Sequence, residues 1–222
     1  MIYLLLIGSV LIGYAIALII NRRSAIPVTL LLAFSGAYLL GVSLFELLPE
    51  VYNSLERSSG LYIVLGLLLQ IVLDFLSRGA EHGHLHAPAD TGRFPILLFI
   101  GLSLHAVVEG IPAANNEDVL VGVMVHKVPI AIILGLYFIR SEYSRRTASI
   151  FLLLFALMTP LGSWISLKTD FLLRFGSYAE GIALGLFLHV ATTILFESSR
   201  DHKFNLVKLA SIIGGFVIAY LV

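Results

Sequence analysis

The sequence predicts an all-α polytopic membrane protein with eight transmembrane helices and both termini on the outer side. The 222 residues are 59% hydrophobic and 13% charged, whereas soluble domains carry about 25% charged residues. Mean hydropathy is correspondingly high, at +0.98. Apolar runs follow one another with short polar connections, and basic residues gather at alternate connections. This composition excludes a soluble globular domain.

Each apolar run is near the ~20 residues that cross the hydrocarbon core. We expect the spans at 2–20, 27–48, 60–77, 94–113, 119–139, 147–167, 178–197 and 204–222. The first run is not expected to be a cleaved signal peptide, because its charges, Arg22 and Arg23, follow the apolar stretch. No linker divides the chain, so residues 1–222 are expected to form one membrane domain.

Orientation is predicted from the basic residues, which are enriched on the cytoplasmic side of membrane proteins. Alternate connections and span ends carry ten of them: Arg22, Arg23, Arg78, Arg93, Arg140, Arg145, Arg146, Arg200, Lys203 and Lys208. The opposite side carries only three, which are Arg57, Lys168 and Arg174. The richer side is expected to be cytoplasmic, and so is the loop at 78–93, which contains His82, His84 and His86.

Two adjacent spans carry ionisable residues well inside their apolar stretches: His105 and Glu109, then His126 and Lys127. Such residues are costly at that depth and commonly mark a function or a partner. His105 and Glu109 are four residues apart and so share one helix face. Glu109 and His126 each lie eight residues from the acidic connection between the spans, roughly 12 Å below the outer surface. The hairpin therefore brings all three to similar depths.

Two imidazoles and a carboxylate form a ligand set that suits zinc best, then iron, cobalt, nickel or manganese. Cysteine is absent, so thiolate ligands and disulfides are excluded. Pro112 and Pro129 follow the polar runs and are expected to free the carbonyls of Val108 and Val125.

A purely structural arrangement fits the same residues, with the histidines bonded to neighbouring helices and Glu109 paired with Lys127. Lys127 could also occupy the place of a second metal ion, or lose its proton when a metal arrives. Glu46, near the outer end of its span, and His189, in the middle of another, are further metal-ligand candidates. For each, a solvated acid or a satisfied interior histidine is the alternative.

Several motifs together resemble those of the ZIP zinc/iron permease family. Residues 105–110 read His-Ala-Val-Val-Glu-Gly, similar to the family's His-Asn-x-Pro-Asp/Glu-Gly in its fourth span. Residues 126–131 read His-Lys-Val-Pro-Ile-Ala, similar to the fifth-span motif. Residues 46–50 read Glu-Leu-Leu-Pro-Glu and residues 185–190 read Gly-Leu-Phe-Leu-His-Val, where the family has His-Leu-Leu-Pro-Glu and Gly-x-Phe-Leu-Tyr-Val. The chain resembles a divergent, prokaryotic-type member.

The resemblance implies eight spans in a ZIP-like bundle with both termini outside. Family members often bind two metal ions, but here Ala106, Lys127, Ile130 and Thr159 replace usual second-metal ligands. His105, Glu109 and His126 match the first metal position. We therefore expect a single-metal site, with Lys127 standing in for the second cation.

These observations predict a transporter, not an enzyme, that moves a divalent metal toward the cytoplasm by alternating access. Zinc is the expected cargo, with Fe²⁺, Mn²⁺, Co²⁺ and Cd²⁺ as further candidates. The rivals are a metal-binding, sensor-like family member without flux, and an intramembrane metal-dependent hydrolase. We expect a multi-pass protein of a cell membrane, the bacterial inner membrane or an equivalent, with no nucleic-acid partner. A homodimer is left open.

Overall fold

The computed structural model describes residues 1–20, 28–82, 94–141, 143–197 and 206–222. These residues form helices and turns, with no strand among them. In chain order the helices are α1 (Ile2–Ile20), α2 (Val28–Val42), α3 (Leu48–Leu55), α4 (Ser59–Ser77), α5 (Ile96–Gly110), α6 (Glu117–Arg140), α7 (Arg145–Lys168), α8 (Asp170–Glu197) and α9 (Leu206–Leu221). A π-helical turn at Ser43–Leu47 joins α2 to α3.

The class of fold is confirmed, since the described part of the chain is a bundle of apolar helices. Among the described residues, five helical stretches are long and apolar enough to cross a membrane: Ile2–Ile20, Val28–Ser77, Glu117–Arg140, Arg145–Lys168 and Asp170–Phe196. The second has 50 residues and contains two of the predicted spans. Ile96–Gly110 and Leu206–Leu221 are shorter apolar helices. Every predicted span overlaps a helix, whereas the count of eight crossings and the orientation stay predictions.

Large apolar side chains cover much of the outer surface. Phe75 is 84% exposed, Phe196 is 76% exposed and Leu97 is 55% exposed. Soluble monomers rarely present apolar surface on this scale. Lipid is the solvent that such a surface fits, which agrees with a multi-pass membrane protein.

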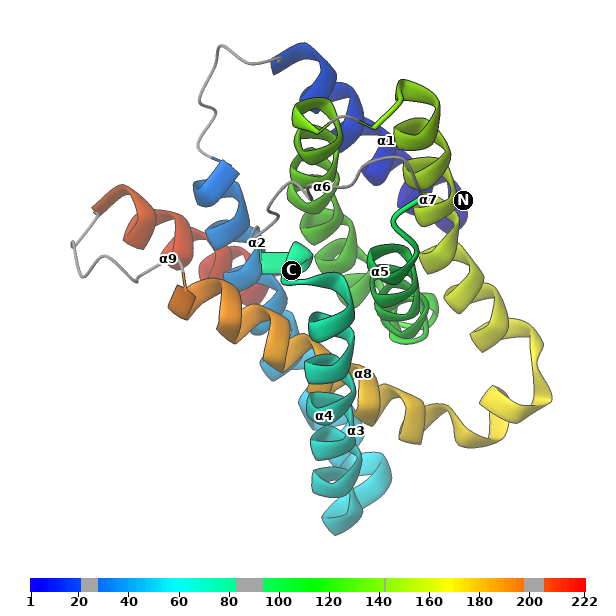
Figure 1. Ribbon diagram of the computed structural model, residues 1–222. Coiled ribbons are helices and arrows are strands. Elements are labelled where there is room, and N and C mark those ends of the chain that lie inside the picture. The colour runs from blue at the N-terminus through cyan, green and yellow to red at the C-terminus, as the bar shows by residue number, and fades with distance from the viewer. Residues whose placement is uncertain (21–27, 83–93, 142, 198–205) are drawn as a thin grey trace.

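Two groups of helices make up the bundle (Figure 1). In the first group α1 packs along α6, α5 packs along α7, and α1 also contacts α7. In the second group α4 packs along α8, while α2 lies against both α9 and α8. The groups meet chiefly where α2 contacts α6 and α4 contacts α5.

Some predicted connections are helical. Residues 49–55 continue as α3, with Pro49 directly after the π-helical turn. α8 begins at Asp170 rather than near 178, and bends at Phe175. Both differences arise outside the apolar runs, where hydropathy carries no information about helix ends.

The expected effect of the two prolines needs correction. α5 does end at Gly110 before Pro112, but the carbonyl of Val108 accepts a hydrogen bond from the amide of Ile111 at 3.2 Å, so it is not free. α6 continues through Pro129 without a break, from Glu117 to Arg140, and the freed carbonyl of Val125 stays a prediction. Membrane helices tolerate proline where neighbouring helices and local adjustments compensate for the lost bond.

Candidate metal site

The predicted pair on α5 is formed as the helical period requires. His105 and Glu109 lie one turn apart, and both are buried, with 3% and 0% of their surfaces exposed. The Nε2 atom of His105 lies 3.2 Å from Oε2 of Glu109. One face of α5 therefore presents an imidazole nitrogen and a carboxylate oxygen side by side.

Glu109 is held by two neighbouring helices. Lys127 of α6 forms an ion pair with Oε1 of Glu109, and Thr159 of α7 donates a hydrogen bond to the same oxygen at 2.9 Å. The Lys127 ammonium also lies 4.3 Å from the centre of the Phe155 ring, a cation–π contact. Of the roles considered for Lys127, the structure shows the one in which its ammonium neutralises Glu109.

Close contact between α5 and α7 makes the Thr159 bond possible. A Cβ atom on Gly162 would lie 2.0 Å from the carbonyl oxygen of Val107, and one on Gly110 would lie 2.2 Å from that of Thr159. Glycine is therefore required at both positions for the backbones to approach. Ser163 fastens the same crossing by donating to the carbonyl of Gly110 at 2.8 Å.

The other ring nitrogen of His105 is held by residues that the sequence did not single out. Nδ1 donates to the side-chain carbonyl of Gln70, on α4, at 3.0 Å, and lies 3.5 Å from Oε2 of Glu81. The Gln70 amide donates to the same Glu81 oxygen, which fixes the orientation of the amide. Gln70 and Glu81 are 0% and 1% exposed.

Both ring nitrogens of His105 thus lie near side-chain oxygens, Nδ1 near Gln70 and Glu81 and Nε2 near Glu109. A metal ion needs the lone pair of a ring nitrogen, so a metal ion at Nε2 would require that atom to carry no proton.

A signal for Gln70 was present in the sequence, as the only amide or charged residue between Ser59 and Leu73. Glu81 lies at the start of the His-containing loop, next to His82, where the sequence gives no sign of a contact with His105. Its approach to His105 depends on the short 3₁₀ turn Ala80–His82, which no periodic pattern indicates.

The remaining predicted ligands lie in different settings. His126 is buried on α6, and its ring centre lies 6.5 Å from that of His105. Glu46 is exposed in the π-helical turn, and His189 is partly buried on α8. Within the described ranges, no three His, Asp or Glu side chains are arranged to hold a metal ion. The metal ligands therefore stay predictions. His84 and His86 lie outside the described residues.

A bundle of apolar helices with a buried His/Glu/Lys network defines a multi-pass membrane protein with an ionic centre. Comparison with known proteins identifies the family. A family model described as "ZIP Zinc transporter" matches residues 93–222, more than half of the chain. The chain therefore belongs to the ZIP zinc transporter family. This is a family of transporters rather than enzymes, in agreement with the expectation for this chain.

Curated relatives come from animals and an amoeba. The chain is 29% identical to "Zinc transporter ZIP2" of Homo sapiens over 149 residues, 61% of this chain and 48% of that protein. It is 26% identical to "Zinc transporter ZIP1" of Danio rerio over 155 residues, 64% of this chain and 51% of that protein. "Protein zntD" of Dictyostelium discoideum is 28% identical over 163 residues, 63% and 24% of the two chains. The matched regions span about half of these relatives or less.

Proposed function

We propose that this protein transports a divalent transition metal, with zinc as its expected cargo, across a cell membrane toward the cytoplasm. In this proposal His105, Glu109 and His126 bind the ion near the middle of the bundle. Glu46 and His189 are further ligands along the path. The site takes one metal ion, and Lys127 replaces a second cation.

The spacing of His105 and Glu109 is the observation that carries the proposal. Ligands at 2.0–2.1 Å in a tetrahedral zinc site are separated by about 3.3 Å. The 3.2 Å between Nε2 and Oε2 matches that separation within a buried centre. This separation supports His105 and Glu109 as two of the three proposed ligands. The ring centre of His126 lies 6.5 Å from that of His105. His126 must therefore move closer to bind the same ion, or water must complete the coordination.

Lys127 supports the single-metal form of the site. Its ammonium binds the Glu109 oxygen Oε1, while Oε2 faces His105. A fixed cation on one oxygen leaves the other to a metal ion and removes the need for a second ion to neutralise the carboxylate. The same cation also repels an arriving metal ion. The alternative function is that of a family member that binds a metal ion without transporting it.

Alternating access is supported by the position of the centre at the boundary between helix groups. Glu109, Lys127 and Thr159 belong to the first group, whereas Gln70 belongs to the second. Relative motion of the groups would separate Gln70 from His105 and open a path to the site. An inside-negative membrane potential favours inward movement by about 2.3 kcal/mol per charge for each 100 mV, so a dication gains about twice that.

Uptake of radioactive zinc into proteoliposomes tests the proposal. We expect saturable uptake with the wild type, its loss in His105→Ala, and its retention in Leu104→Ala. Leu104 is the matched control because it precedes His105 on α5 and is 49% exposed on the outer face. Zinc bound by the purified wild type without uptake would support the sensor reading. If the wild type showed no zinc binding and no uptake, the proposed site would be rejected.

A further inference from the structure

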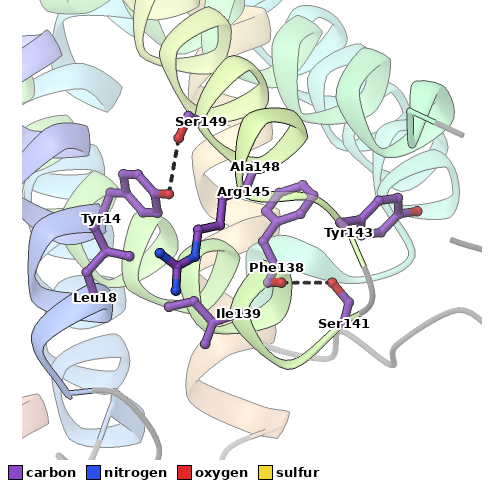
Figure 2. A pocket seen from close by; sticks show the side chains of 9 residues that line it. All are labelled: Tyr14, Leu18, Phe138, Ile139, Ser141, Tyr143, Arg145, Ala148 and Ser149. Atoms are coloured by element: carbon purple, nitrogen blue, oxygen red, sulfur yellow. Dashed lines mark hydrogen bonds between the residues drawn. The ribbon is translucent and has the colours of Figure 1, made fainter. Parts of the chain in front are cut away.

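A cavity of about 830 Å³ lies between three helices of the first group, and none of its lining residues belongs to the His105 centre. Tyr14 and Leu18 of α1 form one side (Figure 2). Phe138 and Ile139, at the end of α6, form another, and the first turns of α7 close the third. The cavity therefore lies where α6 ends at Arg140 and α7 begins at Arg145.

The chemistry of the lining favours an anion. The guanidinium of Arg145 points among Tyr14, Leu18 and Ile139 (Figure 2). None of the nine described lining residues carries a carboxylate. The hydroxyls of Tyr14 on α1 and Ser149 on α7 lie 3.4 Å apart, where these two sides of the cavity meet. A guanidinium beside neutral hydroxyls is a recognition set for phosphate oxygens, which Arg binds in bidentate geometry.

The surroundings of the cavity favour a ligand that also has apolar chains. Leu18, in the lining, is 50% exposed, and Leu11, two turns earlier on α1, is 40% exposed. On α7, Ile150 and Leu154 are 41% and 39% exposed. Apolar helix surface therefore continues from the cavity along both α1 and α7. The helix ends place the guanidinium at the level of a membrane surface, where basic pockets between helices bind anionic head groups.

We propose that this cavity binds an anionic phospholipid, with the phosphate on Arg145 and the hydroxyls of Tyr14 and Ser149. The acyl chains lie along α1 and α7. Such a lipid joins α1 to the start of α7 and so braces the first helix group at one membrane surface. This proposal is independent of metal transport, because it uses none of the residues of the His105 centre.

Native mass spectrometry of the full chain in a neutral detergent tests the proposal, with phosphatidylglycerol and phosphatidylcholine as probes. We expect the wild type to prefer phosphatidylglycerol. Arg145→Gln should weaken that binding about fivefold, the effect of about 1 kcal/mol from one basic residue near the surface. Arg146→Gln is the matched control, because Arg146 is the next residue, is exposed and is not part of the lining. It should keep the preference.

Three results would overturn the proposal. Equal weakening in both variants would mean general attraction to a basic surface. An unchanged preference in Arg145→Gln would exclude the cavity. If inorganic phosphate protected the wild type from thermal unfolding to the same extent as phosphatidylglycerol, the ligand would be a soluble anion. If Arg145→Gln does not fold, Tyr14→Phe gives a second test, since it keeps the packing and removes one of the proposed phosphate contacts, and unchanged lipid binding in it would also reject the site.

Discussion

At the scale of single residues, the centre of the protein is a chain of polar contacts through an apolar interior. It runs from Glu81 and Gln70 through His105 to Glu109, and ends at Lys127 and Thr159. Each member is buried and each contact depends on the next. Removing one partner therefore leaves another polar group without its bond in a low-dielectric environment, which is more costly than removing both.

Lys127→Met tests whether the Lys127 ammonium, which repels an arriving metal ion, weakens zinc binding at Glu109. Breaking a buried ion pair by removing one partner destabilises a protein by about 3–5 kcal/mol. We expect a lower unfolding temperature without zinc and a larger stabilisation by zinc than in the wild type, because Glu109 gains a free oxygen. The double variant Lys127→Met with Glu109→Gln should recover stability without zinc and lose the response to it. A zinc response in Lys127→Met equal to that of the wild type would contradict this effect of Lys127.

Gln70→Leu tests whether Gln70 positions His105. The amide holds Nδ1 and so presents Nε2 to Glu109. Loss of such an outer partner typically lowers metal affinity about 10–100-fold. We expect weaker zinc binding by equilibrium dialysis, and also a lower unfolding temperature without zinc, because Glu81 and His105 both lose a buried partner. Ile71→Leu, at a neighbouring position that is 52% exposed, is the control. Unchanged zinc affinity in Gln70→Leu would show that the amide has only a packing role.

At the scale of helices, contacts between backbones decide where the polar residues meet. Gly162 and Gly110 bring α7 against α5, and Gly66 does the same between α4 and α8, where an added Cβ would lie 2.0 Å from the carbonyl oxygen of Ile182. Small residues allow this approach in membrane helices. The position of Thr159 against Glu109 follows from the first of these crossings.

Gly162→Ala should separate α5 from α7. The new methyl group would lie 2.0 Å from the Val107 carbonyl, and overpacking of this kind costs about 1–3 kcal/mol or more. We expect a lower unfolding temperature and weaker zinc binding. Gly8→Ala is the control, because a Cβ there meets nothing within 4 Å and alanine improves helix propensity by about 1 kcal/mol. Equal stability of the two variants would refute the close approach.

At the scale of the whole molecule, two helix groups enclose the polar chain between them, and the outer surface is apolar. The number of membrane crossings and the orientation are predictions from the basic residues. They place α3 outside the cell and the start of α7 in the cytoplasm.

Single cysteines test this topology, and the natural chain contains none. Asn53→Cys on α3 and Arg146→Cys on α7 both place the thiol at exposed positions. With a membrane-impermeant maleimide, we expect intact cells to label only Asn53→Cys, and permeabilised cells to label both. Labelling of both in intact cells would contradict the three crossings predicted between them, and the reverse pattern would invert the orientation.

The sequence alone determined the class of protein, the approximate helices and the pairing of His105 with Glu109. These depend on local quantities: apolar run length against bilayer thickness, and a helical period that brings residues four apart together. Tertiary structure decided that Glu109 binds Lys127 and Thr159, that Gln70 and Glu81 hold His105, and that α6 continues through Pro129. Gln70 and Thr159 contact residues 35 and 50 positions away in the chain. Such contacts depend on which helix faces pack together, and in a bundle whose helices are apolar nearly all round, hydropathy does not mark those faces.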